Sequence, residues 1–114
     1  MEIEADPRFV AALRQLEEGD WYDASEGFEE LFFEAVRDEV EFVRLFLQVS
    51  VGLHHTERGQ WRAAYERLEE GVRVLDGVTN PRGVDLAAFR EQVTAAMACV
   101  MRRERPRIKV PRER

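Results

Sequence analysis

The central run of the chain, from Glu39 to Arg58, constrains the fold more than any other segment. It is too apolar for a surface helix and too often interrupted by polar residues to cross a membrane. Its large apolar side chains belong to Val40, Phe42, Val43, Leu45, Phe46, Leu47, Val49, Val51 and Leu53. One narrow polar stripe, at helical steps of three and four, consists of Glu41, Arg44, Gln48, Gly52 and His55. The run therefore predicts a mostly buried helix whose polar stripe needs partners, because an unpaired buried polar group costs about 1–3 kcal/mol.

Length and composition bound the class of protein. The 114 residues suffice for one hydrophobic core. The single cysteine, Cys99, excludes an internal disulfide, and we interpret it as a small core residue. The chain has neither a long uncharged apolar run nor a basic, apolar N-terminus, so we expect no transmembrane span and no secretory signal. These features predict a cytoplasmic protein.

Start and stop signals divide the chain into five predicted helices. Asp6-Pro7 is a strong helix start, and Gly19 ends this first helix near Glu18. The following helices are expected from Trp21 to about Arg37, from Glu39 to Arg58, from Gln60 to about Leu75, and from Leu86 to Val100 or beyond. No stretch alternates long enough to predict a strand. The chain is therefore predicted to be all-α, with one domain over residues 1–101.

Two segments of the chain resemble each other at a constant offset of 40 residues. Residues 19–30 align with residues 59–70, so that Gly19, Trp21 and Ala24 correspond to Gly59, Trp61 and Ala64. In each copy the glycine ends one helix, the tryptophan opens the next as a core residue, and the alanine permits close packing. This step is similar to that of tetratricopeptide proteins. It predicts a compact bundle of about five helices, built from two tetratricopeptide-like hairpins plus a C-terminal capping helix.

Polar residues of the second and central helices form the candidate functional cluster. Antiparallel packing of these helices allows side chains on both to converge between the hairpins. The residues of this predicted polar cluster are Ser25, Glu26, Glu29, Arg44, Gln48 and His55. Glu29 lies beside the apolar stripe of its helix, so we expect it to be partly buried. His54 points about 100° away from His55, which favours a surface or interface position.

The chain also resembles a known family in these regions. The run from Gly19 to Phe32 is similar to a signature of the small helical family catalogued as domain of unknown function 309. The second signature of that family matches Leu47 or Phe46 with Gln48 and, seven residues later, His55. A further match consists of Gly59, Ala64 and Leu68. The resemblance covers roughly residues 10–95. It implies the same compact helical fold and no established activity.

Two departures from the family pattern bear on a metal site. Ser25 stands where the family has histidine, and Phe32 stands where it has tryptophan. A metal site that used this histidine would lose a nitrogen ligand here. The two carboxylates of Glu26 and Glu29 with the imidazole of His55 remain as a candidate set for a divalent ion completed by water.

Three interpretations of the cluster stay open. The first is a satisfied polar network in a non-enzymatic scaffold or interaction module. The second is the divalent-metal site, with hydrolase-like activity. The third is acid–base catalysis by Glu26 or Glu29 with His55. The sequence contains no phosphate loop, Cys-x-x-Cys pair, Ser-His-Asp signature or His-Glu-x-x-His motif, so we expect no cofactor.

The C-terminal residues 102–114 differ from the rest of the chain. They carry a net charge of +5, which leaves −11 on residues 1–101 of a chain with net charge −6. The basic residues are Arg102, Arg103, Arg105, Arg107, Lys109, Arg112 and Arg114. The segment is predicted to be an extended or mobile tail. The alternatives are docking on the acidic body, in the same chain or in another subunit of a homo-oligomer, and salt-sensitive contact with a nucleic acid backbone.

Overall fold

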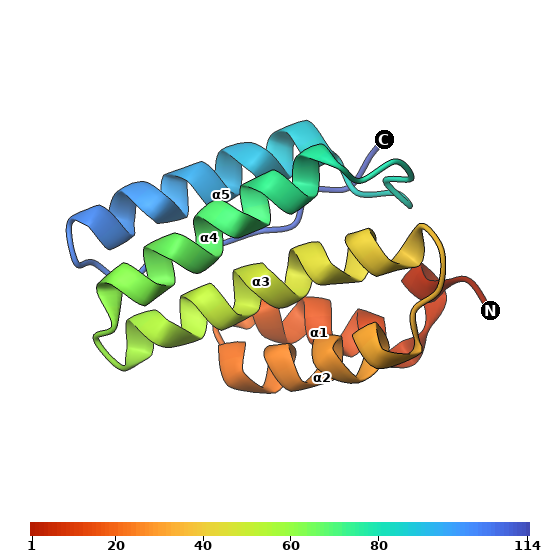
Figure 1. The fold of residues 1–114 in the computed structure, drawn as a ribbon, viewed down its shortest axis with the longest axis horizontal. Helices are drawn as coiled ribbons and strands as arrows, with labels where there is room; N and C mark the ends of the chain where they lie inside the picture. The colour runs from red at the N-terminus through yellow and green to blue at the C-terminus, as the bar shows by residue number, and fades with distance from the viewer.

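The computed structural model describes residues 1–114 and consists of helices and connecting segments (Figure 1). The α-helices are α1 (Pro7–Glu18), α2 (Trp21–Glu34), α3 (Glu39–Glu57), α4 (Trp61–Asp76) and α5 (Leu86–Met101), preceded by a short 3-10 helix, η1 (Ile3–Ala5). The predicted all-α bundle of five helices is thus confirmed. None of these helices combines the length and the apolar character that a bilayer crossing requires.

Helix α1 begins and ends at the capping signals of its sequence, whereas Asp20 precedes α2 without a side-chain cap hydrogen bond. The Asp6 carboxylate accepts a hydrogen bond from the Arg8 amide at 2.9 Å, and Pro7 occupies the first turn of α1. Gly19 ends α1 in the left-handed conformation, with φ 92°. The prediction for α2 was three residues too long at its C-terminus. This helix ends at Glu34, because the chain becomes extended at Ala35 and turns at Arg37 with φ 56°.

The central helix α3 organises the core, as its composition predicts. The Phe46 ring contacts aromatic rings from α1, α2, α3 and α5 at centroid distances of 5.2–5.6 Å. These rings belong to Phe9, Phe28, Phe42 and Phe89. All five phenylalanines are at most 1% exposed. Burial of this many aromatic rings is a major source of stability in so small a domain.

Glycines permit the close approach of α3 and α4. A Cβ at Gly52 would lie 3.1 Å from the Leu68 Cγ and 3.2 Å from the Ala64 carbonyl oxygen. On α4, a Cβ at Gly71 would lie 3.1 Å from the Val49 Cγ2. The two backbones are therefore closer than two alanines would permit. This interface packs the two helices of the second hairpin closely against each other.

The two sequence repeats have the same local geometry. Gly19 and Gly59 both have positive φ, at 92° and 68°. The residue that follows each glycine also has nearly the same backbone angles, φ −86° and ψ 64° in one repeat and φ −90° and ψ 67° in the other. Ala24 and Ala64 are both fully buried. The tryptophans differ, because Trp21 is 2% exposed whereas Trp61 is only partly buried. Trp61 still packs against the core, so the prediction that both are core residues holds fully for Trp21 and in part for Trp61.

The basic C-terminal segment lies in an extended conformation against the body of the same chain (Figure 1). Ile108 and Val110 join the hydrophobic core and are 2% and 3% exposed. The Val110 amide donates to the Glu17 carboxylate of α1 at 2.9 Å, and the Lys109 amide donates to the Gln92 side chain of α5 at 3.0 Å. The segment therefore connects α1 with α5.

Candidate functional site

On α2, the predicted cluster residues are at the surface. The Ser25 hydroxyl donates to the Tyr22 carbonyl one turn earlier, at 2.6 Å. Glu26 and Glu29 are both exposed, so Glu29 is not partly buried as expected. Neither carboxylate forms an ion pair with a basic side chain. These two acids are therefore free to meet a partner from outside the chain.

On α3, the polar stripe finds its partners in α4 and in the turn between α3 and α4. Arg44 lies 3.4 Å from Glu41 of its own helix and 3.9 Å from Glu70 of α4. The Gln48 side chain accepts from Arg67 of α4 at 3.1 Å. The partners of this stripe thus lie on α4, whereas the sequence predicts them on α2. The close approach of α3 and α4 at Gly52 explains why α4 provides them.

His55 also bonds outside the predicted cluster. Its Nδ1 lies 2.6 Å from the Gln60 Oε1, in the turn that precedes α4. None of the six predicted residues hydrogen bonds to another of the six. The structure also contains no group of three or more His, Cys, Asp or Glu side chains that could hold a metal ion. Glu26, Glu29 and His55 are thus not assembled into a ligand set in this structure.

Instead, α2 and α3 present two lines of exposed and half-buried side chains. On α2, Tyr22, Glu26, Glu29 and Phe33 follow one another at steps of three and four, which places them on one line along the helix. On α3, Leu47, Val51 and His54 form a second line by the same spacing. The Tyr22 and His54 rings join the two lines, with centroids 5.2 Å apart. We call these seven residues the α2–α3 face.

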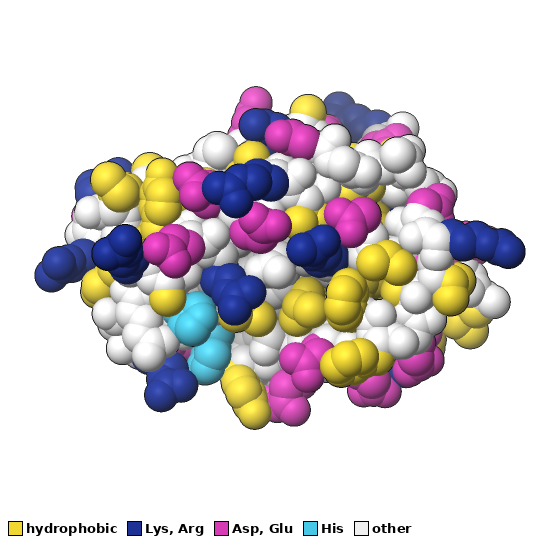
Figure 2. All heavy atoms as spheres, viewed as in Figure 1, with side chains coloured by type: hydrophobic (Ala, Val, Ile, Leu, Met, Phe, Trp, Pro, Cys, Tyr) yellow, Lys and Arg dark blue, Asp and Glu magenta, His cyan; other side chains and the backbone are white.

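The α2–α3 face combines exposed apolar groups with negative charge. Phe33 is 79% exposed and Tyr22 is 55% exposed, whereas Leu47 and Val51 are half-buried. Helix α2 contains five acidic residues and no basic residue. Two of the five, Glu30 and Glu34, pair with Arg8 of α1 at 3.0 and 2.6 Å. Figure 2 shows this side of the molecule, with the two histidines, apolar side chains and carboxylates close to one another.

The charge of Glu26 acts on its neighbour Tyr22. A hydrogen bond to the Glu26 carboxylate raises the pKa of the Tyr22 hydroxyl, and the negative charges of Glu26, Asp23 and Glu29 act in the same direction. The face therefore has a negative potential around its aromatic residue. Such a potential attracts a cationic group.

Sequence reasoning missed Tyr22 and Phe33 as members of a surface. A signal for Phe33 was present, because adjacent residues on a helix point about 100° apart, so Phe32 and Phe33 cannot both face the core. The structure places Phe32 against the core and leaves Phe33 exposed. No comparable signal distinguished Tyr22 from Trp21.

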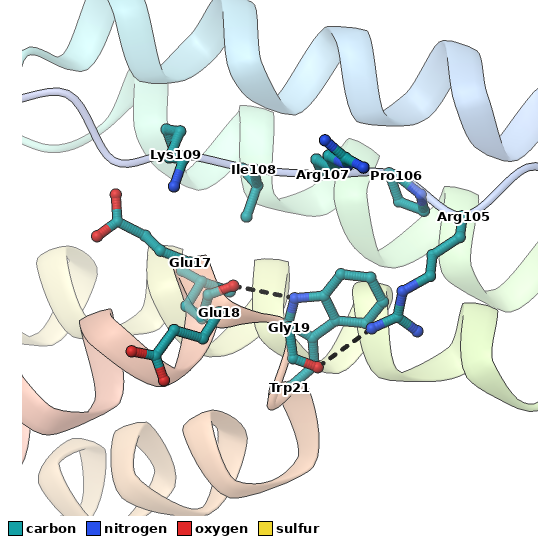
Figure 3. A pocket seen from close by; sticks show the side chains of 10 residues that line it. Glu17, Glu18, Gly19, Trp21, Arg105, Pro106, Arg107, Ile108 and Lys109 are labelled. Atoms are coloured by element: carbon teal, nitrogen blue, oxygen red, sulfur yellow. Dashed lines mark hydrogen bonds between the residues drawn. The ribbon is translucent and has the colours of Figure 1, made fainter.

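A second aromatic site, at Trp21, is covered by the C-terminal segment (Figure 3). The Arg105 guanidinium lies 4.1 Å from the Trp21 ring centroid, within the range of a cation–π interaction. Arg105 also donates to the Gly19 carbonyl at 3.3 Å and pairs with Glu57 at 3.2 Å. A cavity of about 330 Å³ opens beside these residues, between the segment and the end of α1. The chain itself thus supplies the group that covers this tryptophan.

Comparison with known proteins identifies one family. The family described as Domain of unknown function (DUF309) matches residues 9–66, slightly more than half of the chain. The matched region extends from α1 to the first turns of α4 and includes all of the α2–α3 face. No curated protein and no solved structure gives a significant match.

Proposed function

Because this chain belongs to the DUF309 family, for which no activity is described, we propose its role from the surface: a non-enzymatic interaction module that binds a basic amphipathic helix of a partner protein. The binding site is the α2–α3 face. The observation that carries this proposal is the 79% exposure of Phe33 on a helix with no basic residue. An apolar patch with a polar rim is typical of a protein–protein contact, and we infer such a patch from Phe33 together with Tyr22, Leu47 and Val51.

The shape of the face favours a helix as the bound element. Its two lines of side chains run along neighbouring packed helices, so the surface between them is elongated. An amphipathic helix laid along this surface places apolar side chains at steps of three and four against Phe33, Leu47 and Val51. Basic residues at the flanks of that helix then meet Glu26 and Glu29. The Tyr22 and His54 rings would border one end of the bound helix.

Charge supports a basic partner over an acidic one. The carboxylates of Asp23, Glu26 and Glu29 have no ion-pair partner within the chain. The folded chain, including its basic C-terminal segment, carries a net charge of −6, so its overall field also attracts cationic segments. A partner with acidic flanks would place like charges together without compensation.

The experiment measures binding of a fluorescent synthetic helix, with leucine on one face and arginine at its flanks, by anisotropy. Replacing Phe33 by Ser should weaken binding about tenfold, which corresponds to loss of one buried apolar anchor. The double variant Glu26→Gln and Glu29→Gln should weaken binding and flatten its salt dependence. Val10→Ser is the matched apolar control, because Val10 is 52% exposed on α1. Glu91→Gln on α5 is the matched charge control.

Two results would overturn this proposal. A helix with the same leucines but glutamate flanks that binds equally well would exclude charge complementarity. Concentration-dependent dimerisation that Phe33→Ser abolishes, measured by light scattering, would assign the face to a second copy of this chain. Phe33 is exposed, so its replacement should leave the melting temperature unchanged, and the binding data can then be interpreted directly.

A further inference from the structure

The tryptophans of the two repeats are covered to different extents: Trp21 is buried, and Trp61 is partly buried against the core. In the first repeat, Arg105 lies over the Trp21 ring, and the Trp21 indole N–H donates to the Leu16 carbonyl at 3.0 Å (Figure 3). In the second repeat, Trp61 opens α4 at the equivalent position but is only partly buried. Its indole N–H has no hydrogen-bond partner. The second repeat therefore has no side chain that covers Trp61 in the way that Arg105 covers Trp21.

A cavity of about 340 Å³ lies at Trp61. It opens where the start of α4 meets the end of α5, at one end of the long axis of the molecule (Figure 1). The residues that line it are Trp61, Arg62, Tyr65, Glu66, Val100, Met101 and Arg103. This volume is at the lower end of the roughly 300–1,000 Å³ of ligand pockets, so a small molecule fits better than a large one.

The polar groups around this cavity are mostly hydrogen-bond donors. The indole N–H of Trp61 and the hydroxyl of Tyr65 have no partner within the chain. Arg103 is exposed and forms no ion pair. The one carboxylate at the cavity, that of Glu66, is already engaged with Arg62 at 3.2 Å. A ligand that satisfies these donors must bring its own acceptors and negative charge.

We propose that this cavity binds a small aromatic carboxylate. The ring of the ligand packs against Trp61 and Tyr65, which favour offset or edge-to-face contact with another aromatic ring. The ligand carboxylate accepts hydrogen bonds from the Arg103 guanidinium, whose planar fork matches two carboxylate oxygens. Met101, which is 73% exposed, lies at the mouth of the cavity and covers the apolar side of the ligand. Cationic ligands are repelled by Arg103, which has no ion-pair partner, whereas the charge of Arg62 is compensated by Glu66.

The test titrates uniformly ¹⁵N-labelled full-length protein with phenylacetate and follows both indole N–H resonances by NMR. The chain has two tryptophans, so each resonance reports on one repeat. The Trp61 resonance should shift and saturate, whereas the Trp21 resonance should remain in place. Neutral phenylacetamide and cationic phenethylamine have the same ring without the carboxylate. Both should produce a much smaller shift at the same concentration.

Substitutions then assign the ligand to this cavity. Arg103→Gln should weaken phenylacetate binding about tenfold, because a charge-assisted pair is lost. Arg107→Gln is the matched control, since Arg107 is an exposed arginine of the C-terminal segment without an ion pair. Trp61→Phe keeps an aromatic ring and removes the N–H, and it also assigns the indole resonances. Thermal melts of each variant verify that the fold is retained.

Three outcomes would overturn the proposal. The first is the absence of a saturating shift at Trp61 with phenylacetate. The second is binding of phenylacetamide as tight as that of phenylacetate, which would show that the carboxylate is not recognised. The third is an equal loss of affinity in Arg103→Gln and Arg107→Gln, which would indicate attraction by the basic segment as a whole.

Discussion

The guanidinium carbon of Arg82 lies 5.8 Å from the centroid of the Phe42 ring, so a charged group is in contact with the aromatic core. The Arg82 side chain is 6% exposed. Its guanidinium pairs with Asp38 at 2.6 Å and with Glu4 at 3.3 Å. Arg82 thus joins the N-terminal segment, the start of α3 and the loop between α4 and α5.

We expect Arg82→Ala to lower the free energy of unfolding by about 2 kcal/mol, because hydrogen bonds to charged groups and packing on Phe42 are lost together. The measurement is urea denaturation followed by circular dichroism. Arg90→Ala is the control, since the ion pair of Arg90 with Asp76 is exposed and should contribute less than about 1 kcal/mol. An equal loss of unfolding free energy in the two variants would show that burial does not strengthen the ion pairs of Arg82.

A substitution at Gly52 tests the close packing of α3 against α4. Gly52→Ala should destabilise the protein by about 1–3 kcal/mol, since the new methyl group would lie 3.1 Å from the Leu68 Cγ. Gly77→Ala is the control, because a Cβ there would lie 3.5 Å from the Val74 carbonyl oxygen, an ordinary contact. Differential scanning calorimetry compares the two variants. A higher melting temperature for Gly52→Ala would mean that the helices separate at little cost.

The ion pairs of Arg8 predict how the stability of the protein depends on pH. Hydrogen bonds from Arg8 lower the pKa of Glu34 below its ordinary value of 4.5 and that of Asp6 below 3.8. The folded state therefore binds these protons less readily than the unfolded state. Their stabilising contribution is present in full above pH 4.5 and is lost as the pH falls through the lowered pKa values.

Arg8→Gln should consequently be less stable than the wild type at pH 7, and the difference should narrow as the pH falls below 4.5. Thermal melts at a series of pH values measure this convergence. Arg14→Gln is the matched control on the same helix, since Arg14 is exposed and forms no ion pair. A constant difference across the pH range would contradict the assigned ion pairs.

The proposed binding face makes a spectroscopic prediction. Glu26→Gln should lower the pKa of the Tyr22 hydroxyl toward its ordinary value of 10.0, because the hydrogen bond to the Glu26 carboxylate and its negative charge, which together raise it, are removed. The ultraviolet absorbance of tyrosinate follows this titration, in a Tyr65→Phe background that leaves Tyr22 as the reporting group. An unchanged titration curve would show that Glu26 does not affect the ionisation of Tyr22. It would also weaken the case for a negative potential on the face.

The sequence predicts the helices where a local signal determines the structure. Asp6-Pro7 and Gly19 act within a few residues, so α1 matches its expected bounds. The end of α2 has no such signal, because Arg37 rather than glycine adopts the left-handed turn. Trp21 and Trp61 show the same limit. They are identical in the repeat pattern, but the C-terminal segment places Arg105 over Trp21 alone.

The candidate site was less accessible to sequence reasoning for a related reason. The spacing of Arg44, Gln48 and His55 places them on one side of α3, but spacing does not identify the neighbouring helix. That choice depends on which pair of backbones approaches more closely, and Gly52 and Gly71 decide it in favour of α4. Phe33 became part of the α2–α3 face because Phe32 took the core position.

The contact between Glu17 and Val110 has a consequence for the order of folding. It joins residues 93 positions apart, whereas α1 to α5 pack mainly against their neighbours in sequence. Helical hairpins of low contact order form early, and closing a long loop is entropically costly until the rest of the chain is compact. We therefore expect the C-terminal segment to dock last. The interactions of this segment should therefore slow unfolding more than they speed up folding.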